Sequence, residues 1–288
     1  MAITSELVKQ LREKTGAGMM DCKKALEETG GDFEKAIEYL RKKGAAVAAK
    51  RAERTANEGL ILTRISEDGK TAAIVELNCE TDFVARSEAF TELANKITDL
   101  VFANNFSNLD ELLNAQIDGL TVTDLINEAV GKIGEKIQLS RFKKVNVENG
   151  SIVDYIHPGS KLGVLVIFEY TKPVPADFKT FGRDIAMQIA AMKPMTISRD
   201  EVDKELIEKE IEIYKTQARN EGKPEQVLER IAQGKLEKFY QEVCLLEQAF
   251  VKDGSKSVGE LIKYYNEANN TDVKVKQFIR FHLADEKK

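Results

Sequence analysis

The sequence predicts a mixed α+β protein made of two related halves, with a group of helices before them and a helical insertion within the second half. Up to about residue 56 the apolar residues recur with a helical period, and from Gly59 they alternate as in β-strands. The strand pattern that begins at Gly59 returns at Gly150, at a constant offset of 91 residues. At 288 residues the chain is longer than a typical single domain, so it has room for several compact units.

The first 55 residues predict a helical module with a linker. Apolar residues spaced three or four apart predict three short helices within 5–43: Leu7, Val8 and Leu11; Cys22, Ala25 and Leu26; Phe33, Ile37 and Leu40. Gly16 and the pair Gly30-Gly31 supply C-terminal stops, and Asp32 is a good N-cap for the third helix. A helical linker rich in Ala, Lys and Arg, 45–56, then leads to Gly59. We assign 1–55 to this module.

Two β-hairpins come next, one in each half. The first joins strands 60–65 and 72–77 through Glu67-Asp68-Gly69, and the second joins 152–156 and 163–168 through His157-Pro158-Gly159. Later segments also match, since 121–126 resembles 257–262, each with a capping box, and 139–142 resembles 278–281. An internal duplication explains one register held across a whole hairpin. The predicted subdomains are 56–147 for the first half, and 148–197 with 247–288 for the second.

The insertion at 198–246 predicts an antiparallel helical hairpin. Ser198 to Glu201 has the spacing of a capping box, and Gly222-Lys223-Pro224 marks the turn between the two helices. The apolar stripes that need a cover are Val202, Leu206, Ile207, Ile211 and Tyr214 on the first helix, and Val227, Ile231, Leu236, Phe239 and Val243 on the second. Packing of the two helices on each other and docking onto another subunit remain equal alternatives.

Composition argues against several classes of ligand. Lys and Arg total 43 against 48 Asp and Glu, and the net charge of −5 has the wrong sign for a protein that binds phosphate backbones, so we expect no direct nucleic-acid partner. The start of the chain lacks the features of a signal peptide and no stretch approaches 18 apolar residues, so we expect neither export nor a membrane span. The three cysteines have no disulfide or zinc spacing, and each is expected to be a small buried residue in a reducing compartment.

No motif for catalysis, for a metal or for a cofactor is recognisable. The two histidines, His157 and His282, lie in different segments without a Ser or Cys motif beside them. We therefore expect a protein that is not an enzyme and has no cofactor. An acid/base enzyme that uses Glu80, Asp82 and His157 is the weakest alternative, because nothing in the sequence brings these residues into one pocket.

The most informative segment is Thr81-Asp82-Phe83-Val84, directly after a buried strand. Thr81 or Asp82 would be an ordinary N-cap, and Phe83 and Val84 could simply enter the core. The positions of the second half that align with 80–84 are 171–175, and they read Thr-Lys-Pro-Val-Pro. Because equivalent packing would not require such different chemistry, the first copy is expected to have a task that the second lacks.

Longer motifs resemble a known family. Residues 11–26 read Leu-Arg-Glu-Lys-Thr-Gly-Ala-Gly-Met-Met-Asp-Cys-Lys-Lys-Ala-Leu, and residues 76–86 read Glu-Leu-Asn-Cys-Glu-Thr-Asp-Phe-Val-Ala-Arg. Together with 161–166 and 254–261, and in this order along nearly the whole chain, they resemble the bacterial elongation factor Ts family. The resemblance implies a UBA-like N-terminal three-helix module, two related core subdomains and a coiled-coil dimerisation hairpin.

The resemblance also implies a function. It implies a cytoplasmic guanine-nucleotide exchange factor that releases GDP from elongation factor Tu during translation, with Thr81, Asp82, Phe83 and Val84 entering near the partner's magnesium site. Matching positions nominate further partner contacts, namely Met19, Met20, Lys23 and His157. The family often has one more helical module after the closing strand, whereas this sequence stops at 281–288, so that contact is expected to be missing. Affinity for the partner is therefore expected to depend more on the N-terminal module and the core. The alternative is a translation-associated binding adaptor without exchange activity.

Overall fold

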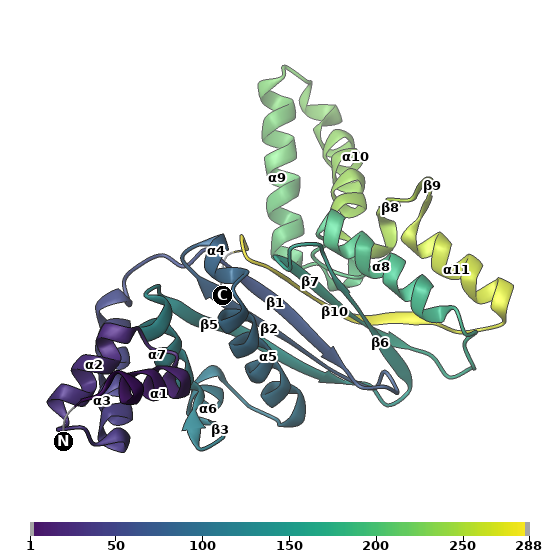
Figure 1. Ribbon diagram of the computed structural model, residues 1–288. Helices are drawn as coiled ribbons and strands as arrows, with labels where there is room; N and C mark the ends of the chain where they lie inside the picture. The colour runs from purple at the N-terminus through teal and green to yellow at the C-terminus, as the bar shows by residue number, and fades with distance from the viewer. Residues whose placement is uncertain (1–2, 286–288) are drawn as a thin grey trace.

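The computed structural model describes residues 3–285 of the chain. It has a group of helices at the N-terminal end, two three-stranded antiparallel sheets with helices in the middle, and a pair of long helices that project from the second half (Figure 1). The mixed α+β class predicted from the sequence is confirmed. Residues 1–2 of the predicted N-terminal module and residues 286–288 of the predicted second subdomain lie outside the described residues. The division into domains stays a prediction.

Three helices form the N-terminal part: α1 (Ser5–Thr15), α2 (Met19–Glu28) and α3 (Phe33–Arg51). Their limits agree with local signals. Gly16 ends α1 with a left-handed conformation, φ 65°, and the Asp32 side chain caps α3 by accepting a hydrogen bond from Lys35 N at 3.1 Å. Their facing sides enclose a small core of Val8, Leu11, Cys22, Ala25, Leu26 and Ala36.

The third helix is longer than predicted. The sequence suggested a short helix up to about residue 43 and then a separate helical linker, whereas α3 runs without a break to Arg51. Gly44, which lowers helix propensity, lies inside it. Tertiary packing overrides that preference, because Gly44 lies against α7 (Val122–Ile133), where only a residue without a side chain fits.

The two sheets have the same topology. The first has the order β1-β2-β5 and the second the order β10-β7-β6, so the second strand of each hairpin is central in both sheets. The elements of the first half are β1 (Glu58–Ile65), β2 (Thr71–Cys79), α4 (Asp82–Ala85), α5 (Glu88–Ala103), α6 (Leu109–Asn114), β3 (Gln116–Ile117), β4 (Leu120–Thr121), α7 and β5 (Ile137–Asn146). Those of the second are β6 (Gly150–Ile156), β7 (Leu162–Glu169), α8 (Phe178–Met192), η1 (Arg199–Glu201), α9 (Lys204–Asn220), α10 (Glu225–Val243), η2 (Leu245–Glu247), β8 (Ala249–Phe250), β9 (Asp253–Ser257), α11 (Val258–Asn269) and β10 (Lys274–His282).

The duplicated hairpins share one register. Gly59 pairs with Asn78 in the first hairpin, and Gly150 pairs with Glu169 in the second, so both partners are shifted by the predicted offset of 91. Both glycines have positive φ, 149° and 147°, and a Cβ atom would lie 2.1 Å from Leu77 O in the first and 1.8 Å from Phe168 O in the second. A close approach of the backbone therefore requires glycine at the same place in each half.

The halves face each other about a local two-fold relation. Ile61 N donates to Ser160 O at 2.7 Å, and its equivalent Ile152 N donates to Gly69 O at 2.7 Å. Thr63 Oγ1 donates to Asp154 Oδ2, its own equivalent, at 2.6 Å. Such reciprocal contacts are those of an isologous interface. Apolar residues from both sheets fill the space between them: Ile61, Ala72, Ile74, Val145, Val147, Ile152, Leu165, Ile167, Phe281 and Leu283.

The central strands β2 and β7 are consequently buried on both faces. Ala73, Val75 and Leu77 point to the first helix-covered core, whereas Ala72 and Ile74 point to the opposite sheet. In β7 the same alternation separates residues that face α8 and α11 from those that face the other sheet. This double burial explains why both strands read as continuous apolar runs in the sequence.

The projecting pair α9 and α10 begins differently from the prediction. The expected capping box at Ser198 does not form: residues Arg199–Glu201 make one 3-10 turn, and α9 starts at Lys204 behind the cap Asp203. The Glu201 carboxylate accepts from Ile197 N at 2.9 Å instead of from Ser198 N, and Val202 is buried in an extended conformation. The helices pack on each other through Ala218, Leu228, Ala232 and Leu236.

Candidate functional site

Residues 81–84 form a tight turn at the surface between β2 and α5. The Thr81 hydroxyl caps the single-turn helix α4 by accepting a hydrogen bond from Val84 N at 3.4 Å. Ala85 is buried and Val84 packs against the core of the first half, but the Phe83 side chain is 81% exposed. The alternative that Phe83 enters the core is therefore wrong, whereas for Val84 it is correct in part.

Asp82 lies beside Phe83 and is half-exposed. Its carboxylate pairs with the Arg86 guanidinium one turn later in the same short segment. Exposed pairs of this kind contribute little to stability, so Arg86 can readily exchange this partner for another one. The surface of the turn thus carries one large apolar ring next to a carboxylate and a guanidinium.

The backbone before the turn is held by Glu135, a residue that the sequence did not single out. Glu135 Oε2 accepts hydrogen bonds from Thr81 N at 3.0 Å and from Glu80 N at 3.2 Å, and its Oε1 accepts from the Thr81 hydroxyl at 2.7 Å. Hydrogen bonds to a charged acceptor are the stronger ones in proteins. Glu135 comes directly after Gly134, which ends α7 in a left-handed conformation, φ 79°, and turns the chain toward β5.

Glu80 holds the same junction from the other side. Its Oε1 accepts from Lys136 N at 2.6 Å, and the carboxylate forms ion pairs with Arg51 at 3.4 Å and with Arg54 at 3.1 Å. Donation by Lys136 N–H, together with the neighbouring guanidinium of Arg54, lowers the pKa of Glu80. A carboxylate that is ionised and fully engaged in this way is poorly suited to donate a proton as a general acid.

The joint between the N-terminal helices and α7 is close-packed. Arg41 of α3 forms ion pairs with Asp124 at 3.4 Å and with Glu128 at 3.5 Å on α7. Beside them the helices cross at two glycines, Gly44 and Gly131, where a Cβ on Gly131 would lie 3.0 Å from Gly44 Cα. Small residues allow two helix backbones to approach this closely. The N-terminal helices are thereby attached to the first half.

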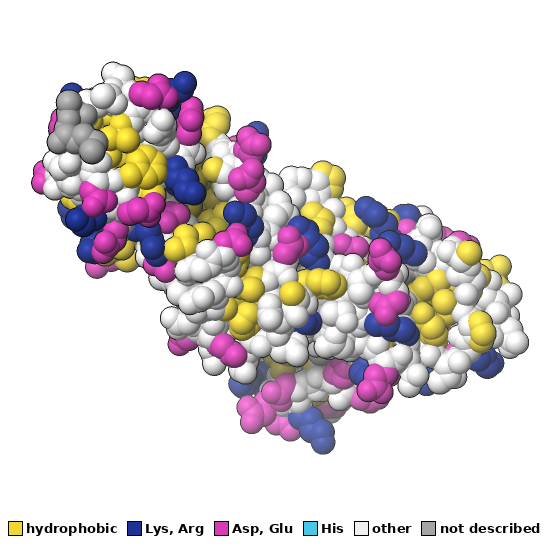
Figure 2. Space-filling view, turned by 60° about the horizontal axis from the view of Figure 1, so that its bottom comes forward, with side chains coloured by type: hydrophobic (Ala, Val, Ile, Leu, Met, Phe, Trp, Pro, Cys, Tyr) yellow, Lys and Arg dark blue, Asp and Glu magenta, His cyan; other side chains and the backbone are white. Residues whose placement is uncertain are grey.

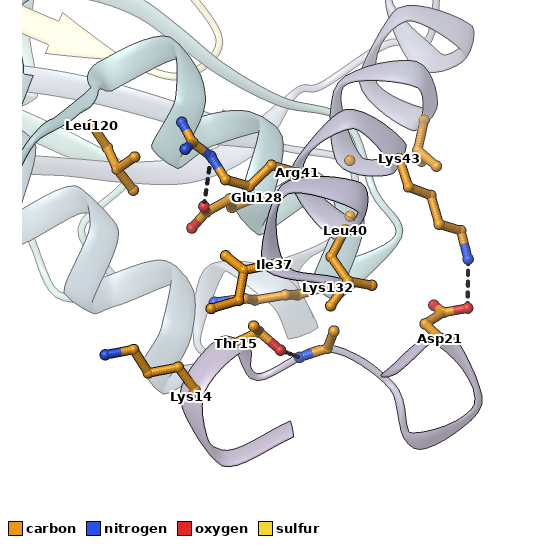
Figure 3. A pocket seen from close by; sticks show the side chains of 14 residues that line it. Lys14, Thr15, Asp21, Ile37, Leu40, Arg41, Lys43, Leu120, Glu128 and Lys132 are labelled. Atoms are coloured by element: carbon orange, nitrogen blue, oxygen red, sulfur yellow. Dashed lines mark hydrogen bonds and ion pairs between the residues drawn. The ribbon is translucent and has the colours of Figure 1, made fainter. Parts of the chain in front are cut away.

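A cavity of about 220 Å³ lies at this joint (Figure 3). Figure 2 shows the hollow between the N-terminal helices and the rest of the molecule, with hydrophobic side chains bordered by charged ones. Ile37, Leu40 and Val47 supply apolar lining from α3, and at the rim Lys43 Nζ pairs with Asp21 Oδ1 at 2.5 Å. The cavity belongs to the seam between two packed units.

The remaining predicted contact residues lie elsewhere. Met19 and Met20, at the start of α2, are 55% and 72% exposed, and Lys23 pairs with Glu27 at 3.9 Å. His157 lies in the turn of the second hairpin, where its Nδ1 is 2.8 Å from Tyr155 Oη. It borders a surface cavity of about 420 Å³ with an apolar lining that includes Leu162, Met187, Ala190 and Val251.

Two negative findings concern residues 3–285. No group of three or more His, Cys, Asp or Glu side chains in this part of the chain is arranged to hold a metal ion. Among the described helices, none has the length and apolar character needed to cross a bilayer.

Known proteins match the chain over nearly its whole length. The family model described as elongation factor TS matches residues 80–285. The elongation factor Ts of Chlorobaculum tepidum is 49% identical over 98% of this chain and 99% of its own length, and that of Prosthecochloris aestuarii is 50% identical over the same shares. The protein of the same name from Clostridium perfringens is 47% identical over 98% of this chain and 93% of its own.

The chain belongs to the elongation factor Ts family. Membership places it among the elongation factors of protein biosynthesis, and the resemblance identified from its motifs is confirmed. The region that matches the elongation factor Ts family model begins at Glu80, whose carboxylate accepts from Lys136 N, and includes the surface turn and the second half up to residue 285.

Within this elongation factor Ts family member the predicted residues form three separate groups: Thr81 to Val84 in one turn, Met19, Met20 and Lys23 on α2, and His157 in the second hairpin. Within residues 3–285 no hydrogen bond or ion pair joins His157 to Glu80 or Asp82. An acid/base site of these three residues thus has no geometric support. No local pattern in the sequence indicates Glu135, because its hydrogen-bond partners are more than 50 positions away along the chain.

Proposed function

We propose that the protein is a guanine-nucleotide exchange factor for elongation factor Tu, acting in the cytoplasm as a binding protein and not as an enzyme. It would bind the GDP-bound or nucleotide-free GTPase, insert the turn 81–84 near the magnesium site and promote GDP release. The main observation that supports this proposal is that the Phe83 side chain is 81% exposed, on a turn whose backbone is held by a hydrogen bond from Thr81 N to Glu135. A large ring held outside the core is costly to leave in water and is suited to enter a partner's pocket.

The energetics require more than this ring. Exchange is a reciprocal coupling, because the factor weakens GDP binding as much as GDP weakens binding of the factor. Shifting the balance by about 10⁴-fold takes roughly 5.5 kcal/mol, whereas burial of a Phe side chain contributes about 1.5 to 3 kcal/mol. We therefore propose additional contacts by Met19, Met20 and Lys23 and by the surface around His157, while Asp82 acts on the cation or phosphate side of the site.

The test compares Phe83→Ala with Tyr264→Ala in the full-length protein. Tyr264 is also an exposed aromatic residue, 61% exposed, but lies on α11 of the second half, away from the turn. Release of labelled GDP from elongation factor Tu is measured at rising factor concentration. Loss of about 1.5 to 3 kcal/mol corresponds to release that is about 10- to 150-fold slower with Phe83→Ala, whereas Tyr264→Ala should match the wild type.

Undiminished exchange by folded Phe83→Ala would refute the role of this residue. A wild-type protein that binds elongation factor Tu without accelerating GDP release would support the adaptor function instead. We expect neither result to depend on a nucleic acid, a membrane, or a metal or cofactor bound by this protein itself.

We also propose that α9 and α10, as a coiled-coil hairpin, mediate a homodimer. The supporting observation is that their mutual packing leaves Ile213 46% exposed on a projecting arm. Sedimentation of the intact chain beside a variant that lacks 198–246 tests this, and a monomeric intact chain would contradict it.

A further inference from the structure

A carboxylate clasps the chain at the same place in both halves of the molecule. In the first half Glu135 accepts from the backbone N–H groups of Glu80 and Thr81 and from the Thr81 hydroxyl. In the second half Asp272 accepts from Thr171 N at 2.9 Å, from Lys172 N at 2.9 Å and from the Thr171 hydroxyl. Each clasp therefore consists of two backbone donors and one threonine hydroxyl on a single carboxylate.

The two clasps are equivalent by position as well as by chemistry. Glu135 and Asp272 each stand two residues before the closing strand, β5 in one half and β10 in the other. Their backbone donors follow the central strands: Glu80 comes directly after β2, and Thr171, at the offset of 91, is separated from the end of β7 by one residue. In the second clasp the pKa of Asp272 is lowered to about 2, chiefly by the hydrogen bond from the Thr171 hydroxyl.

The segments directly after the two clasps differ. After Thr81 the chain forms α4 and exposes Phe83, whereas after Lys172 it continues as Pro-Val-Pro without a helical turn. The first clasp also has a second arm, because Glu80 accepts from Lys136 N and pairs with Arg51 at the end of α3. Residues 80–81 and 135–136 thus hold each other reciprocally.

This second arm connects the turn to the N-terminal helices. Helix α3 begins in the N-terminal core, crosses α7 at Gly44 and ends at Arg51, which pairs with Glu80. Helix α7 ends just before Gly134, and Glu135 comes next. The C-terminal ends of both helices that meet at the glycine crossing therefore contact the two residues that precede α4, Glu80 and Thr81.

We infer that Glu135 is a positioning residue for exchange, an inference that rests on the proposed function. Its carboxylate fixes the backbone at Glu80 and Thr81 and so presents Phe83 in one orientation before the partner arrives. Fixing a group in its bound geometry in advance lowers the entropy lost on binding, and misplacement by about 1 Å can cost up to about 100-fold in rate. Asp272 makes the same kind of clasp in a half without an exposed ring, and its role is confined to holding that half together.

The test uses Glu135→Ala with Asp272→Ala as the matched control and Glu135→Gln as the conservative variant, all in the full-length chain. GDP release from elongation factor Tu is measured at saturating factor. We expect release at least about tenfold slower with Glu135→Ala and unchanged with Asp272→Ala. Glu135→Gln keeps an oxygen for the two backbone donors and should fall between the wild type and Glu135→Ala.

A second readout does not depend on exchange activity. Hydrogen exchange of the Thr81 and Val84 amides in the free protein should be at least about tenfold faster in Glu135→Ala and unchanged in Asp272→Ala. Equal release by wild type and Glu135→Ala, or equal slowing by both alanine variants, would overturn the inference. If the wild type itself does not accelerate GDP release, the proposed function fails, and amide exchange alone decides whether Glu135 orders the turn.

Discussion

The glycine crossing between α3 and α7 gives a sharp prediction, because the chain contains a matched control. Gly44 and Gly234 both lie inside long helices, α3 and α10, and neither has positive φ. Replacing glycine by alanine in a helix interior stabilises it by about 1 kcal/mol when nothing else changes. The two positions differ only in what the added methyl group meets.

At Gly44 the methyl group meets backbone. A Cβ there would lie 2.7 Å from Asn127 O and 3.3 Å from Asn127 C on α7, whereas a Cβ at Gly234 would have no heavy atom within 4 Å apart from the neighbouring backbone of its own helix. Backbone atoms cannot swing away as a flexible side chain does, so the two helices must separate. Overpacking of this kind costs about 1 to 3 kcal/mol. The gain in propensity then leaves Gly44→Ala destabilised by about 0 to 2 kcal/mol, and Gly234→Ala stabilised by about 1 kcal/mol.

Equilibrium unfolding in urea, monitored by far-UV circular dichroism, measures both changes. We expect the unfolding midpoint to rise for Gly234→Ala, and not to rise for Gly44→Ala, with faster amide exchange in α3 of the latter as its contact with α7 loosens. Equal stabilisation by the two substitutions would show that α3 and α7 do not touch at Gly44, and would refute the account of how the N-terminal helices are attached.

Two further predictions concern ionisable groups. The pKa of Asp272 is lowered from 3.8 to about 2, and a lowered pKa adds stability that is present above the usual pKa and is lost as the pH falls through the lowered one. The free energy of unfolding should therefore fall less steeply between about pH 4 and pH 2 in Asp272→Asn than in the wild type. Parallel curves of unfolding free energy against pH would contradict this. Burial, with the nearby Glu135 charge, raises the pKa of the Cys79 thiol to about 12. Iodoacetamide at about pH 8 should therefore alkylate Cys79 readily only after the protein is unfolded in urea. Fast labelling of this thiol in the folded protein would disagree with its burial.

Much of the fold could be predicted from the sequence because its signals are local. The helix limits at Gly16 and Asp32 depend on residues within one turn, and the capping boxes at Thr121 and Ser257 formed as expected. The equivalence of Gly59 and Gly150 was visible because a duplication repeats its backbone requirements at a fixed offset. At Ser198 the capping box predicted from local spacing does not form, because the Glu201 carboxylate accepts a hydrogen bond from Ile197 N, one residue earlier.

The sequence by itself therefore determined the three N-terminal helices, the duplicated hairpins, the projecting helical pair and the unusual chemistry of residues 81–84. Only the tertiary structure decided that Phe83 lies outside the core, that α3 continues through Gly44, and that Glu135 holds the turn. The physical reason is the distance along the chain between the groups involved. Periodicity and capping join residues a few positions apart, whereas the packing of α3 on α7 and the bonds of Glu135 form only after chain closure brings remote segments together.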